Sequence, residues 1–241
     1  MSKKKVALII GAGDCLGSAI ARKFAQNGYH IVATRRRGDL DNLVTEIKNA
    51  GGVGEGRHSD ARDEDEVRNL IADIEDNIGP IGACVFNVGG NVSFPLQETT
   101  TRVYRKVWEM CALAGFLMGR EVITPMLKRG QGTIIFTGAT ASLRGASGYS
   151  AFAGGKHALR ALAESMAREF GPQGIHIAHV VVDGLIDNPN TKDLFPDLFN
   201  QKPVDGIINP DDLADIYWDL HKQKRTAWTF EVDARPYSET F

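Results

Sequence analysis

Short apolar runs rich in β-branched residues alternate with amphipathic stretches along the chain, and this alternation constrains the fold more than any other feature. The first apolar run, 6–10, precedes a stretch in which Leu16, Ile20 and Phe24 recur at helical spacing, and a second run follows at 31–34. Residues four apart share one face of a helix, and continuous β-branched runs suit buried parallel strands. The start of the chain therefore predicts a βαβ unit.

The same alternation predicts the remaining elements. It places further strands at 83–88, 133–137, 175–182 and 228–233, and helices at about 40–47, 67–74, 101–128 and 149–170. Strands that alternate with helices this regularly form a parallel sheet with helices on both faces. We expect a single-domain α/β fold over 1–241, with a doubly wound parallel sheet of about seven strands.

Composition excludes several classes of partner. The 241 residues carry a net charge of −2, so nothing in the balance of charge attracts nucleic acid or an anionic membrane. The apolar run 6–10 is too short for a signal sequence or a membrane span. Cys15, Cys84 and Cys111 lack CxxC spacing, which argues against a disulfide framework and a zinc site. We expect a cytoplasmic protein that has reduced thiols, holds no metal and acts on a small molecule.

A glycine-rich turn separates the first predicted strand from the first predicted helix. Its sequence is Gly11-Ala12-Gly13-Asp14-Cys15-Leu16-Gly17. Such a turn lets a backbone approach a pyrophosphate at the N-terminus of a helix. The alternative is that the glycines only make a tight turn. The candidate cofactor-binding residues here are Gly11, Gly13, Asp14, Cys15, Leu16 and Gly17.

The spacing of Gly11 and Gly17 resembles the T-G-x-x-x-G-x-G turn of the short-chain dehydrogenase/reductase family. Ile10 replaces the threonine of that turn and Cys15 its middle glycine, so the phosphate site could be loosened or repositioned. Partial matches follow in order over essentially the whole chain. The resemblance implies a Rossmann-type fold and a dinucleotide cofactor. It also implies a homodimer or homotetramer built on the helices at 101–128 and 149–170. These two helices carry more apolar surface than the cover of a sheet needs, at Met110, Leu113, Leu117, Met118, Leu159, Leu162 and Met166.

Two further matches concern the ends of predicted strands. Asp60 and Ala61 resemble the family's acidic position after the third strand, whose side chain meets the adenine amine. Asn87 and Gly89 resemble its N-N-A-G strand end, although Asn87 could simply stitch the sheet together. We take these four residues as candidate cofactor ligands.

Arginines follow the second predicted strand, where the family often has an aspartate that accepts a hydrogen bond from the ribose 2′-hydroxyl. Arg35, Arg36 and Arg37 stand there instead. Guanidinium groups bind a 2′-phosphate bidentately, so we expect Arg35 and Arg36 to select NADP(H) over NAD(H). The alternative is a solvated basic loop that faces Asp39 and Asp41.

The resemblance also carries four catalytic roles: a serine, a tyrosine, a lysine and a helix asparagine. Lys156 matches the lysine, which lowers the pKa of the tyrosine and holds the nicotinamide ribose. Phe152 stands in place of the tyrosine, Ala139 in place of the serine, and Cys111 or Ala112 in place of the asparagine. Phenylalanine has the aromatic ring of tyrosine but lacks the phenolic hydroxyl that acts as acid or base. The sequence therefore predicts an atypical member of the family.

Neighbouring residues raise alternatives at these positions. Cys111 could be a nucleophile if a cation lowered its pKa, or it could be a buried, inert thiol. Lys156 follows Gly154 and Gly155, and two glycines in a helix cost about 1 kcal/mol each, so we expect a close contact there, with the cofactor. Tyr149 is expected to pack at the start of its helix rather than to replace the missing tyrosine.

The segment after the strand at 175–182 resembles the family's P-G-x-x-x-T stretch, which meets the nicotinamide carboxamide. Gly184 is kept, and Ile186 and Asn188 could still contact the carboxamide. Asp183 replaces the proline and is a candidate acid or base, or a salt-bridge partner of Lys156. The irregular segment 187–210, which contains Phe195 and Phe199, could be a lid or a surface connection.

Three functions are compatible with these residues. The first is an NADP(H)-dependent oxidoreductase that transfers a hydride to or from a small carbonyl or alcohol, with water, Asp183 or a substrate group as proton source. The second is a catalytically silent protein that binds a dinucleotide or assembles with an active relative. An enzyme with non-redox chemistry in the same pocket is a third alternative.

Overall fold

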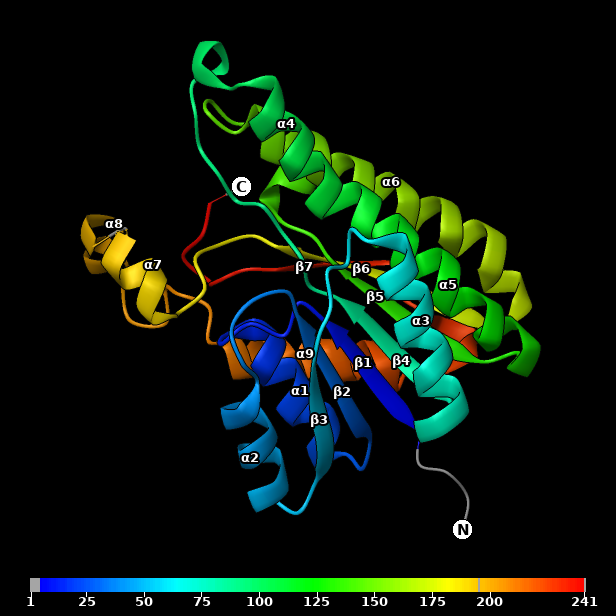
Figure 1. The fold of residues 1–241 in the computed structure, drawn as a ribbon. Helices are drawn as coiled ribbons and strands as arrows, with labels where there is room; N and C mark the ends of the chain where they lie inside the picture. Colours follow the sequence, from blue (N-terminus) through cyan, green and yellow to red (C-terminus); the bar gives the residue numbers. More distant parts are fainter. Residues whose placement is uncertain (1–4, 195, 241) are drawn as a thin grey trace.

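The computed structural model describes residues 5–240 except residue 195, and these form a three-layer α/β sandwich (Figure 1). The parallel strands lie in the order β3-β2-β1-β4-β5-β6-β7. Their bounds are β1 Val6–Ile10, β2 His30–Arg35, β3 Val53–His58, β4 Ile81–Phe86, β5 Gly132–Thr137, β6 Ile175–Val182 and β7 Glu231–Ala234. The doubly wound seven-stranded parallel sheet is thus confirmed.

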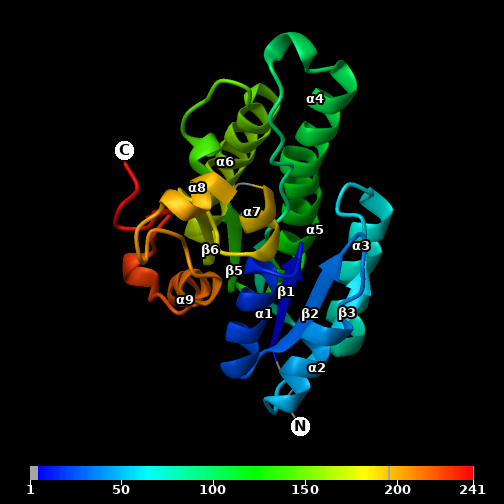
Figure 2. The same ribbon diagram turned by 90° about the vertical axis from the view of Figure 1, so that its left-hand side faces the viewer.

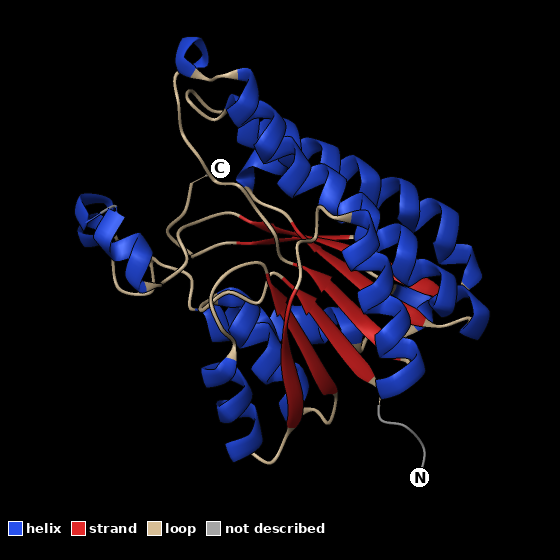
Figure 3. Cartoon of the chain, viewed as in Figure 1, coloured by secondary structure: helices blue, strands red, loops and turns tan. Residues whose placement is uncertain are grey.

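Helices cover both faces of this sheet (Figure 3). One face packs against α1 Leu16–Gln26, α2 Asp41–Asn49 and α9 Pro210–His221, and the other against α3 Glu64–Asp73, α5 Ala114–Arg129 and α6 Ser150–Phe170. Helix α4 Thr101–Trp108 packs on α6 and has its buried residue in a separate small cluster. The central strand β1 is buried at every residue, as its apolar, β-branched sequence predicts. Each face of the sheet therefore has its own hydrophobic core.

The predicted helix at 101–128 is one continuous helical stretch of three parts. A π-helical turn, Glu109–Leu113, joins α4 to α5, and the stretch ends at Arg129 before a left-handed Gly130. By length and hydropathy this stretch could cross a membrane, but 56% of its apolar window is buried in the fold. It serves here as a core helix.

The apolar residues that suggested an oligomer face are largely used inside the fold. Leu117, Met118, Leu159 and Met166 are at most 6% exposed. The exposed apolar side chains of this helix pair are instead Tyr104, Trp108 and Phe116. The expectation of surplus apolar surface is therefore wrong for these four residues, which fill the core on this face of the sheet, whereas Met110, Leu113 and Leu162 are partly buried.

The last predicted strand begins later than expected. Residues Arg225–Ala227 form a 3₁₀ turn, and Trp228 stacks on His176 instead of pairing with β6. Strand β7 therefore starts at Glu231.

The segment 187–210 protrudes beside the carboxyl ends of the strands (Figure 2). It contains the short helices α7 Pro189–Leu194 and α8 Pro196–Gln201. A parallel bridge between Ile186 and Ile208 closes its base. Of the two aromatic residues noted there, Phe195 lies outside the described residues, and Phe199 packs under the Lys192 ammonium.

Candidate active site

The sheet changes direction of winding between β1 and β4, since β1 pairs with β2 on one side and with β4 on the other. In open α/β sheets, ligands bind outside the carboxyl ends of the strands at such a switch point. Two cavities of about 740 and 290 Å³ lie there. They share the lining residues Gly11, Gly13, Asn87, Val88 and Gly89. One groove therefore runs across the switch point.

The glycine turn has a steric reason at each of its two outer glycines. Gly11 has φ +86°, and a Cβ there would lie 2.6 Å from the Asn87 carbonyl oxygen. A Cβ on Gly17 would lie 2.5 Å from the Gly11 carbonyl oxygen. Gly13 differs, because its Cβ position has no atom within 4 Å and the residue lines both cavities. A ligand can therefore approach the backbone at Gly13.

The remaining residues of the turn also line the groove. Asp14, Cys15 and Leu16 line the larger cavity, and Cys15 occupies the N-cap position of α1. The Cys15 thiol donates to the Asp187 carbonyl oxygen over 3.5 Å, and burial raises its pKa. The side chain that replaces the family's middle glycine thus links the turn to the 187–210 segment.

Asn87 stitches the sheet to the glycine turn, and it is also placed where a cofactor ligand was predicted. Its backbone N–H donates to the Ile10 carbonyl and its Nδ2 donates to the Gly11 carbonyl over 3.0 Å, so it fixes the glycine turn to the end of β4. It also lines both cavities, together with Gly89.

Basic side chains surround the smaller cavity. Arg35 donates to the Asp14 carboxylate over 2.7 Å and to the Asp39 carbonyl, whereas Arg36 lies 4.0 Å from Asp60. Asp60 is held by Arg62, and these hydrogen bonds are the main reason that its pKa is lowered to about 2. Both Arg35 and Arg36 line the cavity, as do Asp60 and Ala61. The four residues predicted to bind the adenosine part of the cofactor are thus brought together at this end of the groove.

Lys156 lies at the floor of the larger cavity and is 3% exposed. Its ammonium donates to the Thr137 carbonyl over 2.7 Å and to the Val88 carbonyl over 3.3 Å. The Phe152 ring centroid is 5.9 Å from Nζ, within range of a cation–π interaction. Burial lowers the pKa of Lys156. The helix α6 thus presents the lysine and the phenylalanine to the same cavity.

The other candidate catalytic positions are placed differently. Ala139 lines the larger cavity, and its backbone N–H donates to Ser142 Oγ over 3.1 Å. Cys111 is fully buried behind α6, where burial raises its pKa despite the nearby Lys156. A protonated, enclosed thiol is a poor nucleophile, so this arrangement favours the inert alternative.

We had expected the glycine pair before Lys156 to allow a close contact with the cofactor, but its close contacts are with another helix. A Cβ on Gly154 would lie 2.9 Å from the Tyr104 hydroxyl, and one on Gly155 would lie 2.9 Å from Cys111 Cβ. The glycines therefore allow α6 to pack closely against α4 and the π-helical turn. This helix contact is the compensation for their low helix propensity.

Asp183 is 5% exposed and is enclosed by three partners. Its carboxylate accepts from the Thr140 hydroxyl and pairs with Arg235 over 3.1 Å and with Arg144 over 3.3 Å. The expected alternative of a salt bridge to Lys156 is therefore wrong, because Lys156 binds backbone carbonyls instead. Farther along, Gly184, Ile186 and Asn188 do line the larger cavity.

Comparison with known proteins identifies the family. The family model described as short chain dehydrogenase matches residues 5–198. The chain belongs to this family. A short-chain dehydrogenase structure from Rhodopseudomonas palustris is 48% identical, covers 97% of this chain and 98% of its own, and superposes with a TM-score of 0.82.

Curated relatives in the family are more distant. The 3-oxoacyl-[acyl-carrier-protein] reductase of Bos taurus is 28% identical over 197 residues, 82% of each chain. The human dehydrogenase/reductase SDR family member 4 is 29% identical over 195 residues, 80% of this chain and 70% of its own. The family and the fold expected from the glycine turn are therefore confirmed.

Three residues of this groove were not predicted from the sequence. Arg62 binds Asp60, and Arg144 and Asn91 line the larger cavity. Both Arg144 and Asn91 lie in connections between a strand and a helix, where no periodicity predicts the direction of a side chain. The basic character of Arg144 was the one available signal.

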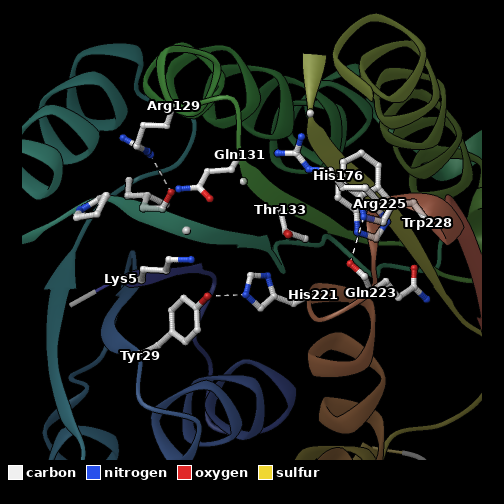
Figure 4. A pocket seen from close by; sticks show the side chains of 15 residues that line it. Lys5, Tyr29, Arg129, Gln131, Thr133, His176, His221, Gln223, Arg225 and Trp228 are labelled. Carbon is white, nitrogen blue, oxygen red and sulfur yellow. Dashed lines mark hydrogen bonds between the residues drawn. The ribbon is translucent and has the colours of Figure 1, made fainter. Parts of the chain in front are cut away.

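A separate cavity of about 280 Å³ lies at the opposite, amino-terminal edge of the sheet (Figure 4). Its wall includes a Tyr29–His221 hydrogen bond of 2.6 Å and the stacked rings of His176 and Trp228. None of the predicted site residues lines it. This cavity is therefore distinct from the groove at the switch point.

Proposed function

We propose that the chain is an oxidoreductase that binds NADP(H) and transfers a hydride to or from a small carbonyl or alcohol. The observation that carries this proposal is the groove, which joins the basic cavity at Arg35 and Arg36 to the Lys156 floor through the open backbone at Gly13. When bound, the nicotinamide would supply or accept the hydride. A metagenomic short-chain oxidoreductase of the same fold, 24% identical, was solved in complex with NADP.

The preference for NADP(H) over NAD(H) is supported by the charge of the smaller cavity. Arg36 is the more available arginine, because its contact with Asp60 spans 4.0 Å, whereas Arg35 is already bound to Asp14. Ser59 and Thr34 line the same wall. We assign the 2′-phosphate to Arg36, with Arg35 as a second donor.

The proton chemistry would differ from that implied by the family resemblance. Phe152 has no ionisable hydrogen to donate. The Asp183 carboxylate is already bound by Thr140, Arg144 and Arg235. Water or a group on the substrate is then the proton source that these contacts favour. A reaction without a positioned acid should be slow on ordinary ketones, since such an acid is worth about 10²–10⁴ in rate.

A silent dinucleotide-binding protein is the alternative. The absence of an acidic hydrogen at Phe152 and Ala139 supports it, and the preserved groove is compatible with both functions. Binding alone does not separate the two. Consumption of NADPH in the presence of a carbonyl compound would separate them.

Calorimetric titration with NADPH and with NADH is the first test. We expect NADPH to bind at least tenfold more tightly, and Arg36→Gln to remove most of this difference. Arg102→Gln, an exposed arginine on α4, is the matched control and should change neither affinity. Equal affinity for both nucleotides would overturn the preference, and binding of neither would overturn the dinucleotide site.

We also propose that the protein assembles as a homodimer or homotetramer through α4, α5 and α6. Tyr104, Trp108 and Phe116 are each more than 40% exposed on this helix layer. Light scattering should give a dimer or tetramer, and Trp108→Glu with Phe116→Glu should shift it toward the monomer. A monomeric wild-type protein would contradict the proposal.

A further inference from the structure

The larger cavity extends beyond the residues assigned to the cofactor. If the proposed function holds, this extension is where a substrate would bind. Its walls come from three parts of the chain: the segment after β4, the segment between β5 and α6, and the residues around the start of α7. The lining residues are Asn91, Thr140, Ala141, Arg144, Gly145, Ala146, Tyr149, Asn188 and Thr191. A substrate bound next to Lys156 and Phe152 would meet these side chains.

Arg144 dominates the electrostatics of this extension. Among the described lining residues of the whole cavity, the charged side chains are Asp14, Arg144 and Lys156. Asp14 belongs to the glycine turn and is bound by Arg35, and Lys156 lies under the reactive floor. Arg144 is therefore the one charged group that the described residues place in the extension.

The charge of Arg144 is only partly balanced. One of its nitrogens lies 3.3 Å from the Asp183 carboxylate, which also binds Thr140 and the closer Arg235. A guanidinium has five N–H donors, and the Arg144 side chain is 49% exposed. Most of its donors are thus available to a ligand.

The buried carboxylate behind Arg144 limits the charge that the site favours. A ligand with two negative charges would face Asp183 across a single guanidinium. A ligand with one negative charge and two acceptor oxygens matches the planar fork without this repulsion. The 21-residue helix α6 begins at Ser150, directly after this segment, and the positive end of its dipole adds to the preference for an anion.

We infer that the substrate is an oxo acid or hydroxy acid whose carboxylate binds Arg144, while its reacting carbon lies toward Lys156 and Phe152. Thr140 cannot donate to the carboxylate while its hydroxyl donates to Asp183. Arg144 therefore determines specificity, and Asp183 is a positioning residue that restrains the guanidinium.

Matched pairs of ligands test this inference. Short oxo acids and their methyl esters are compared as substrates of the full chain with saturating NADPH, by the loss of nicotinamide absorbance. We expect kcat/KM for the acids to exceed that for the esters by at least tenfold. Arg144→Gln should remove this preference by raising KM for the acids 10- to 100-fold, and Arg144→Lys should retain part of it. Arg168→Gln, which changes an exposed arginine near the carboxyl end of α6, is the control.

A binding measurement keeps the inference separate from the proposed hydride transfer. Butyrate and butyramide are titrated into the NADP-bound protein and followed by ligand-observed NMR. Preference for butyrate that Arg144→Gln abolishes would support the carboxylate site even if no carbonyl compound were reduced, in which case the proposed function alone would fail. Equal binding of both ligands, unchanged acid binding in Arg144→Gln, or a preference for a phosphate monoester would overturn the inference.

Discussion

Restoring the missing phenol is the most direct perturbation of the candidate active site. In Phe152→Tyr the new hydroxyl extends from a ring that is 7% exposed, lines the larger cavity and lies 5.9 Å from Lys156 Nζ. A neighbouring ammonium favours the ionised phenol and lowers its pKa. The variant would therefore gain an acid at the position where the family resemblance implies one.

The structure sets the size of the expected gain. A positioned acid is worth about 10²–10⁴ in rate, or roughly 3–5 kcal/mol of activation free energy. The lower end applies to Phe152→Tyr alone, because Lys156 is already held by a 2.7 Å hydrogen bond to Thr137 and Ala139 offers no hydroxyl. We expect about 10²-fold faster carbonyl reduction, with a further gain when Ala139→Ser is added.

The assay is NADPH-dependent reduction of small ketones at saturating cofactor. Phe116→Tyr makes the same chemical change on an exposed ring and serves as the control. The reasoning is refuted if Phe152→Tyr binds NADPH like the wild type and yet reduces ketones no faster. Loss of an existing wild-type activity in the double variant would refute it differently, by showing that Phe152 and Ala139 serve a reaction of their own.

Three further predictions follow from the same contacts. Gly11→Ala should abolish nucleotide binding and lower the melting temperature, since φ is +86° and the new Cβ would meet the Asn87 carbonyl; calorimetry showing normal binding would contradict this. Cys111→Ala should leave turnover within about twofold, because burial raises the thiol pKa and opposes a nucleophilic role; a loss of more than tenfold at unchanged NADPH affinity would revive that role. Burial lowers the pKa of His179 to about 4, so the unfolded chain takes up a proton near pH 6.5 before the folded chain does, and stability should fall as pH falls through this window. Urea unfolding should show a loss of about 2 kcal/mol from His179 between pH 7 and pH 5, and a smaller loss in His179→Gln.

The sheet and the position of the groove were predictable because their signals are local. A run such as Val6–Ile10 indicates a buried strand from its own residues, and the spacing of Gly11 and Gly17 indicates the turn that follows. Parallel strands place their carboxyl ends at one edge, so Asn87, which follows β4, lies near the same turn. Lys156 lies on a helix, and only the family resemblance placed it at this site. These inferences need no knowledge of distant contacts.

The errors concern contacts between segments far apart in the chain. The glycine pair Gly154–Gly155 was assigned to the cofactor, but its neighbours are Tyr104 and Cys111 on another helix. One of the two alternatives for Asp183 was a salt bridge to Lys156, but it pairs with Arg144 and Arg235 from two other connections. Sequence spacing gives the residue types at such places and leaves their partners undetermined.

The bridge between Ile186 and Ile208 separates two parts of the molecule that can change independently. Backbone hydrogen bonds of 2.8 Å, from Asp187 to Ile208 and from Ile208 to Leu185, hold both ends of the intervening segment at fixed positions. Doubling the length of a closed loop costs only about 0.6 kcal/mol. Related chains could therefore exchange this segment for a longer or shorter one while the sheet and the glycine turn stay the same. Selectivity for new substrates could then be acquired without rebuilding the catalytic scaffold.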